Sequence, residues 1–299
     1  MPGSRTGAAR VRMGVALMSG ATLMLPLMDV FAKLLAETMA PLQVAVARFV
    51  GQAGLALLAA LLTRQLAGLR PPGNLWPHLA RGFCLGGATL FFFTALQFMA
   101  IPDALAIFFV QPMILTALGV VVLREKVDVR RLAAAGVGFA GALVIIRPGS
   151  GTFGLGALLP LGAALLFSCY LLLTRHLSER GSMLAAQFTA GVAGAGSLGV
   201  ALALATLLGL PGASASLPVA ADWPMLLGLG LTSFVGHGLV VAAFRRAPAG
   251  VLAPLDYLEM VSATVASWLI FGSVPGAATW AGMALIVASG LYIIRRERG

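Results

Sequence analysis

Charged side chains are scarce in this sequence, and their scarcity excludes most classes of soluble protein. Only 10% of the 299 residues are charged and 60% are hydrophobic, whereas a soluble domain carries about 25% charged residues. The formal charge of +10 does not indicate nucleic-acid binding, because the basic residues lie between apolar segments and not on one polar surface. The composition predicts an integral membrane protein in contact with the lipid bilayer.

Cysteine is nearly absent, and the motifs that bind nucleotides or metals are missing. Cys84 and Cys169 lie inside apolar segments, where two thiols behave as small apolar residues and form neither a disulfide framework nor a metal site. The sequence has no P-loop, no HExxH and no activated serine or cysteine signature. We expect no cofactor, no metal, no ATP hydrolysis and no enzyme activity. An intramembrane enzyme and a structural scaffold are the alternatives from other classes.

Long apolar segments are abundant, and several reach the ~20 residues that a membrane span requires. The first follows Arg5, Arg10 and Arg12, as a secretory signal would, but it is too long for a signal and has no clean cleavage site. We therefore predict an all-α polytopic protein with ten transmembrane helices. The expected spans are residues 13–36, 42–62, 79–98, 104–123, 132–146, 154–173, 184–208, 225–244, 249–271 and 277–294.

Ten spans separate the basic residues sharply between the two sides of the membrane. One side receives only Arg147 and, near a helix end, Lys33. Because positive charge marks the cytoplasm, we predict that both termini are cytoplasmic in a bacterial inner membrane. The basic side receives Arg5, Arg10, Arg12, Arg64, Arg70, Arg81, Arg124, Lys126, Arg130, Arg131, Arg175, Arg180, Arg245, Arg246, Arg295, Arg296 and Arg298.

The two halves of the chain share short motifs at an offset of about 142 to 148 residues. Trp76-Pro77 matches Trp223-Pro224, each just before a span, and Pro102 and Pro248 each open one. Their common order indicates a duplication. Since each half holds five spans, the second copy enters the membrane inverted, an architecture that recurs in transporters. We predict repeats at 1–149 and 150–299 within one membrane domain.

Each half ends in a proline-initiated span, a tight loop and a glycine-rich last span. The motifs are Gln111-Pro112 in the first half and Leu258-Glu259-Met260 and Phe271-Gly272-Ser273 in the second. This arrangement resembles the drug/metabolite transporter superfamily, in particular EamA-type exporters and YddG-like amino-acid exporters. The resemblance implies a central cavity formed chiefly by spans one, three, four, six, eight and nine, with spans five and ten peripheral.

The ninth span carries two carboxylates, which are costly in hydrocarbon and mark functional sites. Helical periodicity places Asp256, Glu259, Ala263 and Ser267 on one stripe, which we expect to face a protein-lined cavity. The opposite stripe is apolar and should face lipid. The predicted substrate-binding residues are Gln111, His237, Asp256, Tyr257 and Glu259.

Three charged residues near the other surface, Asp29, Lys33 and Arg48, are predicted to form an ion pair or triad. It would be a packing lock between two helices, an outer gate, or a cation that binds the carboxylate of an amino-acid-like solute. His237 and Asp256 lie at comparable depth and could pair, which would make His237 a candidate proton-sensitive group. The in-span prolines, Pro26, Pro112 and Pro254, would serve as hinges or simply shape the helices.

Together these features predict a secondary transporter that exports amino acids, aromatic or otherwise apolar ones included, or related small metabolites. Its halves would rock around a central cavity so that the small-molecule substrate meets each side in turn. The alternative within the same fold is a multidrug or organic-cation exporter. We expect a monomer.

Overall fold

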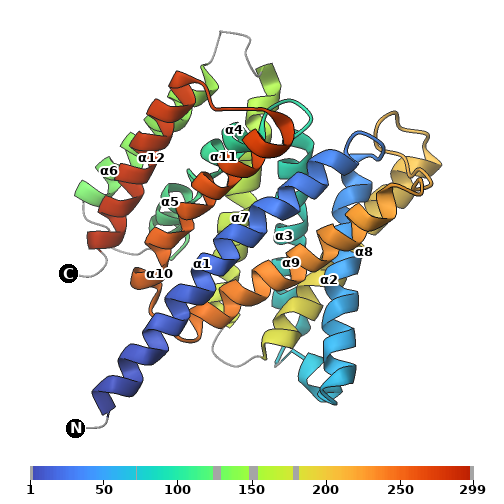
Figure 1. The fold of residues 1–299 in the computed structure, drawn as a ribbon, viewed down its shortest axis with the longest axis horizontal. Coiled ribbons are helices and arrows are strands. Elements are labelled where there is room, and N and C mark those ends of the chain that lie inside the picture. Colours follow the sequence, from blue (N-terminus) through green and yellow to red (C-terminus); the bar gives the residue numbers. More distant parts are fainter. Residues whose placement is uncertain (1–2, 72, 124–128, 148–153, 178–181, 297–299) are drawn as a thin grey trace.

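The computed structural model describes residues 3–71, 73–123, 129–147, 154–177 and 182–296, and within these ranges all regular elements are helices. They are arranged as an elongated bundle (Figure 1). The elements are α1 (Gly3–Leu35), α2 (Pro41–Leu62), η1 (Leu66–Leu69), α3 (Leu75–Ala95), α4 (Ile101–Phe108), α5 (Gln111–Leu123), α6 (Val129–Ile146), η2 (Gly154–Ala157), α7 (Leu158–Leu177), α8 (Met183–Leu207), α9 (Asp222–Phe244), α10 (Ala249–Asp256), α11 (Leu258–Phe271) and α12 (Ala277–Arg296).

The helices make ten membrane spans, as predicted. Six stretches are long and apolar enough to cross a membrane by length and composition, and two shorter helical segments, Ala133–Ile146 and Ala277–Tyr292, are apolar as well. Helix α3 and the pair α10–α11 supply the remaining two. Spans four and nine each consist of two helices, α4–α5 and α10–α11. The protein is therefore an all-α polytopic membrane protein with two inverted five-helix repeats.

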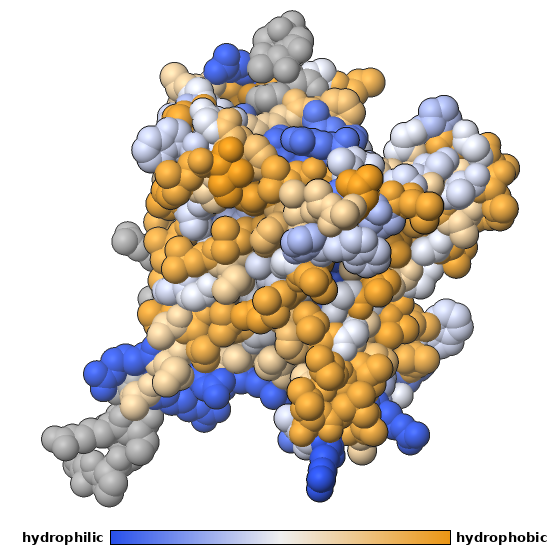
Figure 2. Space-filling model, turned by 45° about the vertical axis from the view of Figure 1, so that its right-hand side comes forward, coloured by the Kyte–Doolittle hydropathy of each residue, from blue (hydrophilic) through white to orange (hydrophobic). Residues whose placement is uncertain are grey.

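The surface of the bundle suits a lipid environment. Large apolar side chains point outward along the spans, with Leu62, Val121 and Leu207 between 76% and 83% exposed. Figure 2 shows a broad apolar band whose lower margin is crowded with hydrophilic atoms. A bilayer core contains no water that could form hydrogen bonds with polar groups, so such a band marks the membrane-embedded zone.

Hydrogen bonds near the ends of the helices show which segments lie together at each end of the bundle. At one end the Arg10 guanidinium donates to the Arg245 carbonyl at 2.9 Å, and the Ser182 hydroxyl donates to the Gly68 carbonyl. We call this end the basic side. At the opposite side the Thr38 hydroxyl donates to the Asp222 carboxylate at 2.9 Å. The pairing of these loops agrees with the ten-span topology.

Arg81 departs from the surface position expected for it. Its side chain is only 5% exposed inside α3 and donates to the Ala186 carbonyl at 3.1 Å and the Thr189 hydroxyl at 3.2 Å in α8. A long side chain can follow a neighbouring helix and bond its polar groups, so burial of an arginine needs only suitable acceptors.

The packing follows the pseudo-twofold relation between the repeats. Helix α1 packs on α9 and, equivalently, α7 packs on α3, while α2 and α8 pack on each other. Helices α6 and α12 form a pair at one edge of the molecule, as expected for spans five and ten (Figure 1). The repeats are therefore interleaved, and most of the interior lies at contacts between them.

Helices α3 and α7 run antiparallel, and the close contacts of two glycines show which residues of the two helices lie opposite each other. A Cβ on Gly87 would lie 2.8 Å from Leu166, and one on Gly162 would lie 2.7 Å from the Phe91 ring. The residue numbers of each opposed pair sum to the same value, 253. Cys84 and Cys169 have that sum as well, so the register places the two thiols opposite each other between the repeats.

We expect oxidation by copper phenanthroline to join these two thiols. Since they are the chain's two cysteines, polyethylene-glycol maleimide should add twice to the reduced, denatured protein and not at all after oxidation. Each addition is counted as a gel shift. In Cys84→Ser the single thiol should still react after oxidation, and two free thiols in oxidised wild type would contradict the register.

Candidate functional site

Spans four and nine are interrupted at equivalent points, each close to one of the in-span prolines. Helix α4 ends at Phe108 and α5 begins at Gln111, while α10 ends at Asp256 and α11 begins at Leu258. Proline lacks the N–H that a continuous helix requires, and Pro112 and Pro254 lie close to the two breaks. Broken spans of this kind build the midplane sites of transporters.

The third predicted hinge, Pro26, lies within the continuous helix α1. Its helix is not interrupted, so the structure places it differently from the other two prolines. Neighbouring helices supply the compensation that a proline in a membrane helix needs, and α9 and α11 both pack on α1.

A row of aromatic rings runs from the break in span nine to the break in span four and on into α7. Tyr257 lies 5.5 Å from Phe109, Phe108 lies 6.3 Å from Phe109 and 5.3 Å from Phe167, and Phe167 lies 5.4 Å from Tyr170, all between ring centroids. These distances are typical of stacked and edge-to-face pairs. The rings come from α4, α7 and the two breaks, so both repeats contribute to the row.

Arg48 of α2 is only 2% exposed and reaches side chains of two other helices, α3 and α9. Its Nε donates to the Ser233 hydroxyl at 3.1 Å, its Nη1 to the Thr89 hydroxyl, and its Nη2 lies 2.9 Å from His237 Nε2. These contacts use one N–H of each nitrogen. A guanidinium has five N–H groups, so two remain for another acceptor.

No ion pair within 4.0 Å neutralises Arg48 among the described residues. It interacts electrostatically with Asp29 of α1 and with Tyr170 at the end of the aromatic row. Glu259 in turn interacts electrostatically with Asp29 and Asp256. We call Asp29, Arg48, Tyr170, His237, Asp256 and Glu259 the central polar cluster. Its residues come from α1, α2, α7, α9, α10 and α11.

The expected triad of Asp29, Lys33 and Arg48 is not formed. The Lys33 ammonium donates to the carbonyls of Leu96 and Met99 at 2.7 and 2.8 Å. Both carbonyls lie in the turn between the end of α3 at Ala95 and the start of α4 at Ile101, where a carbonyl without a helical partner attracts a cation. Arg48 is drawn instead to the hydroxyls and the histidine described above. The pairing of His237 with Asp256 is likewise replaced by the contact between His237 and Arg48.

The other predicted binding residues are placed in different surroundings. The Tyr257 hydroxyl is buried without a hydrogen-bond partner and lies against Gly290 of α12, where an added Cβ would come within 1.6 Å of it. Its ring joins the aromatic row. Gln111 starts α5 and its carbonyl accepts from the Ser168 hydroxyl at 3.1 Å. Asp256 and Glu259 are partly buried.

The two faces of span nine are confirmed. Ala263 and Ser267 are at most 1% exposed, whereas the apolar stripe on the other side of α11 is 43% to 60% exposed. The buried face packs toward α1, where the Ser262 hydroxyl donates to the Thr22 carbonyl. The exposed residues are Leu258, Val261, Val265 and Trp268.

Several polar residues of the site were not anticipated from the sequence. Ser233 donates to Gln52 at 3.2 Å, Gln52 donates to Gln187 at 3.0 Å, and Gln187 donates to the Phe234 carbonyl at 2.8 Å. This chain of bonds extends from Arg48 through α2, α8 and α9. The available signal was a glutamine inside an apolar span, at positions 52 and 187, since a buried amide requires partners.

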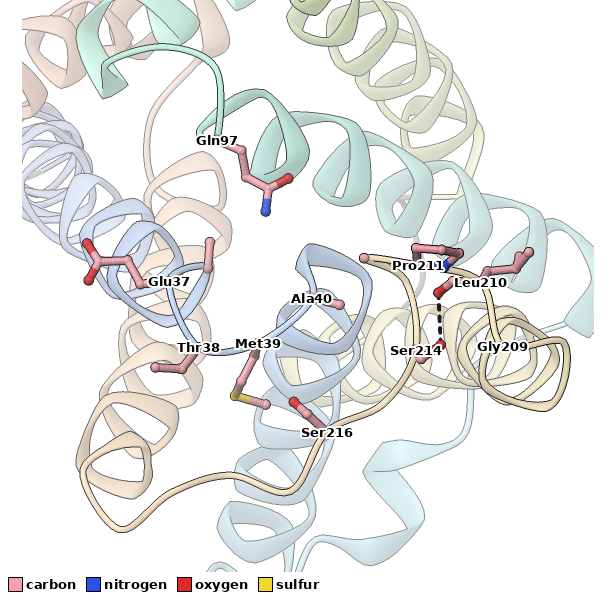
Figure 3. Close-up of a pocket in the computed structure, with 12 residues that line it drawn as sticks. Glu37, Thr38, Met39, Ala40, Gln97, Gly209, Leu210, Pro211, Ser214 and Ser216 are labelled. Carbon is pink, nitrogen blue, oxygen red and sulfur yellow. Dashed lines mark hydrogen bonds between the residues drawn. The ribbon is translucent and has the colours of Figure 1, made fainter.

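A hollow of about 420 Å³ opens at the opposite side, at the ends of α1 and α3 and beneath the loop after α8 (Figure 3). Figure 3 shows Gln97 pointing toward it, with Ser214 bonded to the Leu210 carbonyl on its far wall. Ala36 on its rim is seven residues beyond Asp29, which is about 10 Å along a helix. The hollow therefore lies outside the central polar cluster.

In the described part of the chain, the half-helices of spans four and nine pack more closely against each other on one side of the membrane than on the other. On the opposite side α4 packs against α11, and the Lys33 ammonium lies 5.8 Å from the centre of the Phe271 ring at the end of α11. The symmetry-related helices on the basic side, α5 and α10, share at most a marginal contact among the described residues. The structure is therefore closed between the repeats on the side of α4 and α11.

Comparisons with known proteins agree with this arrangement. Residues 12–147 and 154–295 each match the EamA-like transporter family. A solved crystal structure has the same fold, with a TM-score of 0.67 at 20% identity, and the match covers 95% of this chain and 98% of that one.

Three relatives carry transporter names. The riboflavin transporter of Vibrio cholerae is 31% identical over 227 residues, which are 74% of this chain and 72% of that protein. That of Brucella anthropi is 31% identical over 179 residues, or 59% of this chain and 61% of that protein. The S-adenosylmethionine uptake transporter of Rickettsia bellii is 25% identical over 230 residues, or 74% and 73%.

Proposed function

The chain belongs to the EamA-like transporter family and is a membrane transporter, and from this premise we propose that its substrate is a flat aromatic metabolite, with riboflavin as the first candidate. The observation that carries the proposal is the aromatic row that ends at Tyr170, a residue that interacts electrostatically with Arg48, whose guanidinium keeps two N–H groups for another acceptor. A planar ring system can stack on such a row. Its carbonyl oxygens can accept from a guanidinium.

The names of the relatives support this choice. Two are riboflavin transporters, and S-adenosylmethionine, the substrate in the name of the third, also carries a planar heteroaromatic ring. Phe108, Phe167 and Tyr170 are only partly buried, so a solute that enters between the repeats can contact them. Side chains of Phe92 and Phe109 support these rings from behind, at 8% and 6% exposure.

The second candidate is the export of an aromatic or apolar amino acid. The observation that favours it is the presence of opposite charges in the central polar cluster, the guanidinium of Arg48 on the one hand and the carboxyls of Asp29 and Glu259 on the other. A zwitterion offers a carboxylate to the first and an ammonium to the second. Its aromatic side chain would occupy the same row of rings.

We further propose that the repeats, residues 1–149 and 150–299, rock against each other as two halves of a monomer. Closure between α4 and α11 would alternate with closure between α5 and α10, and the breaks near Pro112 and Pro254 would absorb the bending. The basic side would face the cytoplasm of a bacterial inner membrane, with both termini there.

A binding and transport assay separates the two substrates. We expect riboflavin to raise the melting temperature of the purified protein, because a ligand selective for the folded form stabilises it. We also expect riboflavin to exchange across proteoliposomes. Phenylalanine is the probe for the second candidate, and a planar organic cation tests the multidrug alternative. The direction of transport follows from a comparison of vesicles that contain riboflavin with vesicles that receive riboflavin from the bath.

The row of rings predicts the effect of one substitution. Phe108→Leu removes a ring that contacts three others but keeps an apolar side chain, and should cost about 1 kcal/mol of stacking, or about a fivefold rise in the Kd for riboflavin. Phe139→Leu is the matched control, because Phe139 lies on the peripheral helix α6 and is 38% exposed. Equal riboflavin affinity in both variants would count against a role for the row.

A further inference from the structure

The contact between Arg48 and His237 determines where the histidine carries its proton. A guanidinium has donors only and stays protonated in proteins, so His237 Nε2, which lies 2.9 Å from Arg48 Nη2, must accept. The ring is then neutral, and its proton is on Nδ1. That nitrogen is buried and has no hydrogen-bond partner.

A second proton on His237 is incompatible with this arrangement. It would bind at Nε2, remove the acceptor that Arg48 uses, and place two positive groups at hydrogen-bond distance. Charges at such a separation repel strongly where water is excluded. Arg48 would keep its bonds to Ser233 and Thr89 only in a strained geometry, whereas the carboxyl of Asp29, with which it interacts electrostatically, offers it a negative partner.

The titratable groups around His237 fit this exchange of partners. Helix α9 packs on α1, α2, α8 and α10. These helices carry Asp29 (α1), Arg48 (α2) and Asp256 (α10), while α8 carries the uncharged Gln187; of these charged groups, Arg48 is the one that interacts with His237. Glu259 on α11 and Tyr170 on α7 complete the surroundings of Arg48 and Asp29. Asp29, which interacts electrostatically with Arg48, is therefore the carboxyl to which Arg48 could turn.

We infer that His237 is a proton-binding site that couples proton movement to transport through Arg48. With His237 neutral, Arg48 is held toward α9 and offers its free N–H groups to the solute. With His237 protonated, Arg48 turns to Asp29 and those donors are no longer available. Proton and solute therefore exclude each other, and each cycle exchanges one for the other. This inference rests on the proposed function, because it assigns the coupling ion of the same site.

Proteoliposomes with a pH difference test the inference, with riboflavin as the probe. Exchange predicts that riboflavin accumulates in vesicles whose lumen is more acidic than the bath. Vesicles with a more alkaline lumen should accumulate none. In His237→Gln the amide oxygen can still accept from Arg48 but cannot take up a proton. This variant should accumulate at least tenfold less riboflavin than wild type in vesicles with an acidic lumen. Its riboflavin exchange at equal pH should continue at a reduced rate.

His78→Gln is the matched control and should accumulate riboflavin as wild type does, since His78 lies on α3 near the basic side and outside the central polar cluster. Three outcomes would overturn the proton site alone: indifference to the pH difference, accumulation in alkaline vesicles, and full accumulation by His237→Gln. Absence of any riboflavin exchange at equal pH would instead refute the proposed function, and the inference with it.

Discussion

Replacing Arg48 by methionine is expected to reduce transport about 100-fold. The substitution keeps an unbranched side chain of similar length but removes every donor that holds Ser233, Thr89 and His237 and that would bind the solute. Loss of a buried charged contact costs about 2–5 kcal/mol, and about 2.7 kcal/mol corresponds to a factor of 100. The measurement is the initial rate of solute exchange per folded molecule in proteoliposomes.

Arg81→Met provides the matched control for this experiment. Arg81 is also an arginine inside the bundle, at 5% exposure, with acceptors on a neighbouring helix. It does not contact the central polar cluster. Both variants should lose stability, but only Arg48→Met should lose exchange by two orders of magnitude. Similar exchange rates in the two variants would show that Arg48 is merely structural.

Arg48→Lys should recover little of the activity. Its ammonium keeps the positive charge, yet its donors share one nitrogen and cannot reach acceptors on α3 and α9 at once, as the guanidinium fork does. Recovery to wild-type exchange with lysine would mean that charge alone matters at this position.

The largest effect on stability is expected from Gly51→Val. A Cβ at Gly51 of α2 would lie 2.8 Å from the Gly230 Cα of α9, which is backbone and cannot turn away as a side chain can. The two helices must separate, and overpacking of this kind costs about 1–3 kcal/mol or more. Arg48 and Ser233 lie within three residues of this crossing, so their contact should weaken as well. We expect a lower melting temperature and less folded protein after extraction.

Gly54→Val is the matched control on the same helix. Gly54 is exposed, and an added Cβ there would meet nothing within 4 Å. The same change of residue type should therefore leave the melting temperature close to that of wild type. Equal destabilisation by the two substitutions would point to helix propensity and not to the contact between α2 and α9.

The aromatic row and the polar bonds show why the site was only partly predictable. Asp29, Arg48, His237, Asp256 and Glu259 are conspicuous in the sequence because a charge or an imidazole in an apolar span is costly. Their partners are not conspicuous. The depth of each residue along its helix suggested that Asp29 pairs with Arg48 and His237 with Asp256. Depth does not determine how the helices are rotated or where they cross. The structure joins Arg48 to His237 instead.

The sequence by itself determined the number of spans, their faces, the basic side and the duplication, because each follows from the transfer of local segments between water and lipid and from the residue pattern along the chain. Only the tertiary structure decided the breaks at the ends of α4 and α10, the carbonyls that bind Lys33 and the chain of bonds from Arg48 to Gln187. These depend on which helix surfaces meet, since a long polar side chain takes whichever acceptor the packing brings within reach.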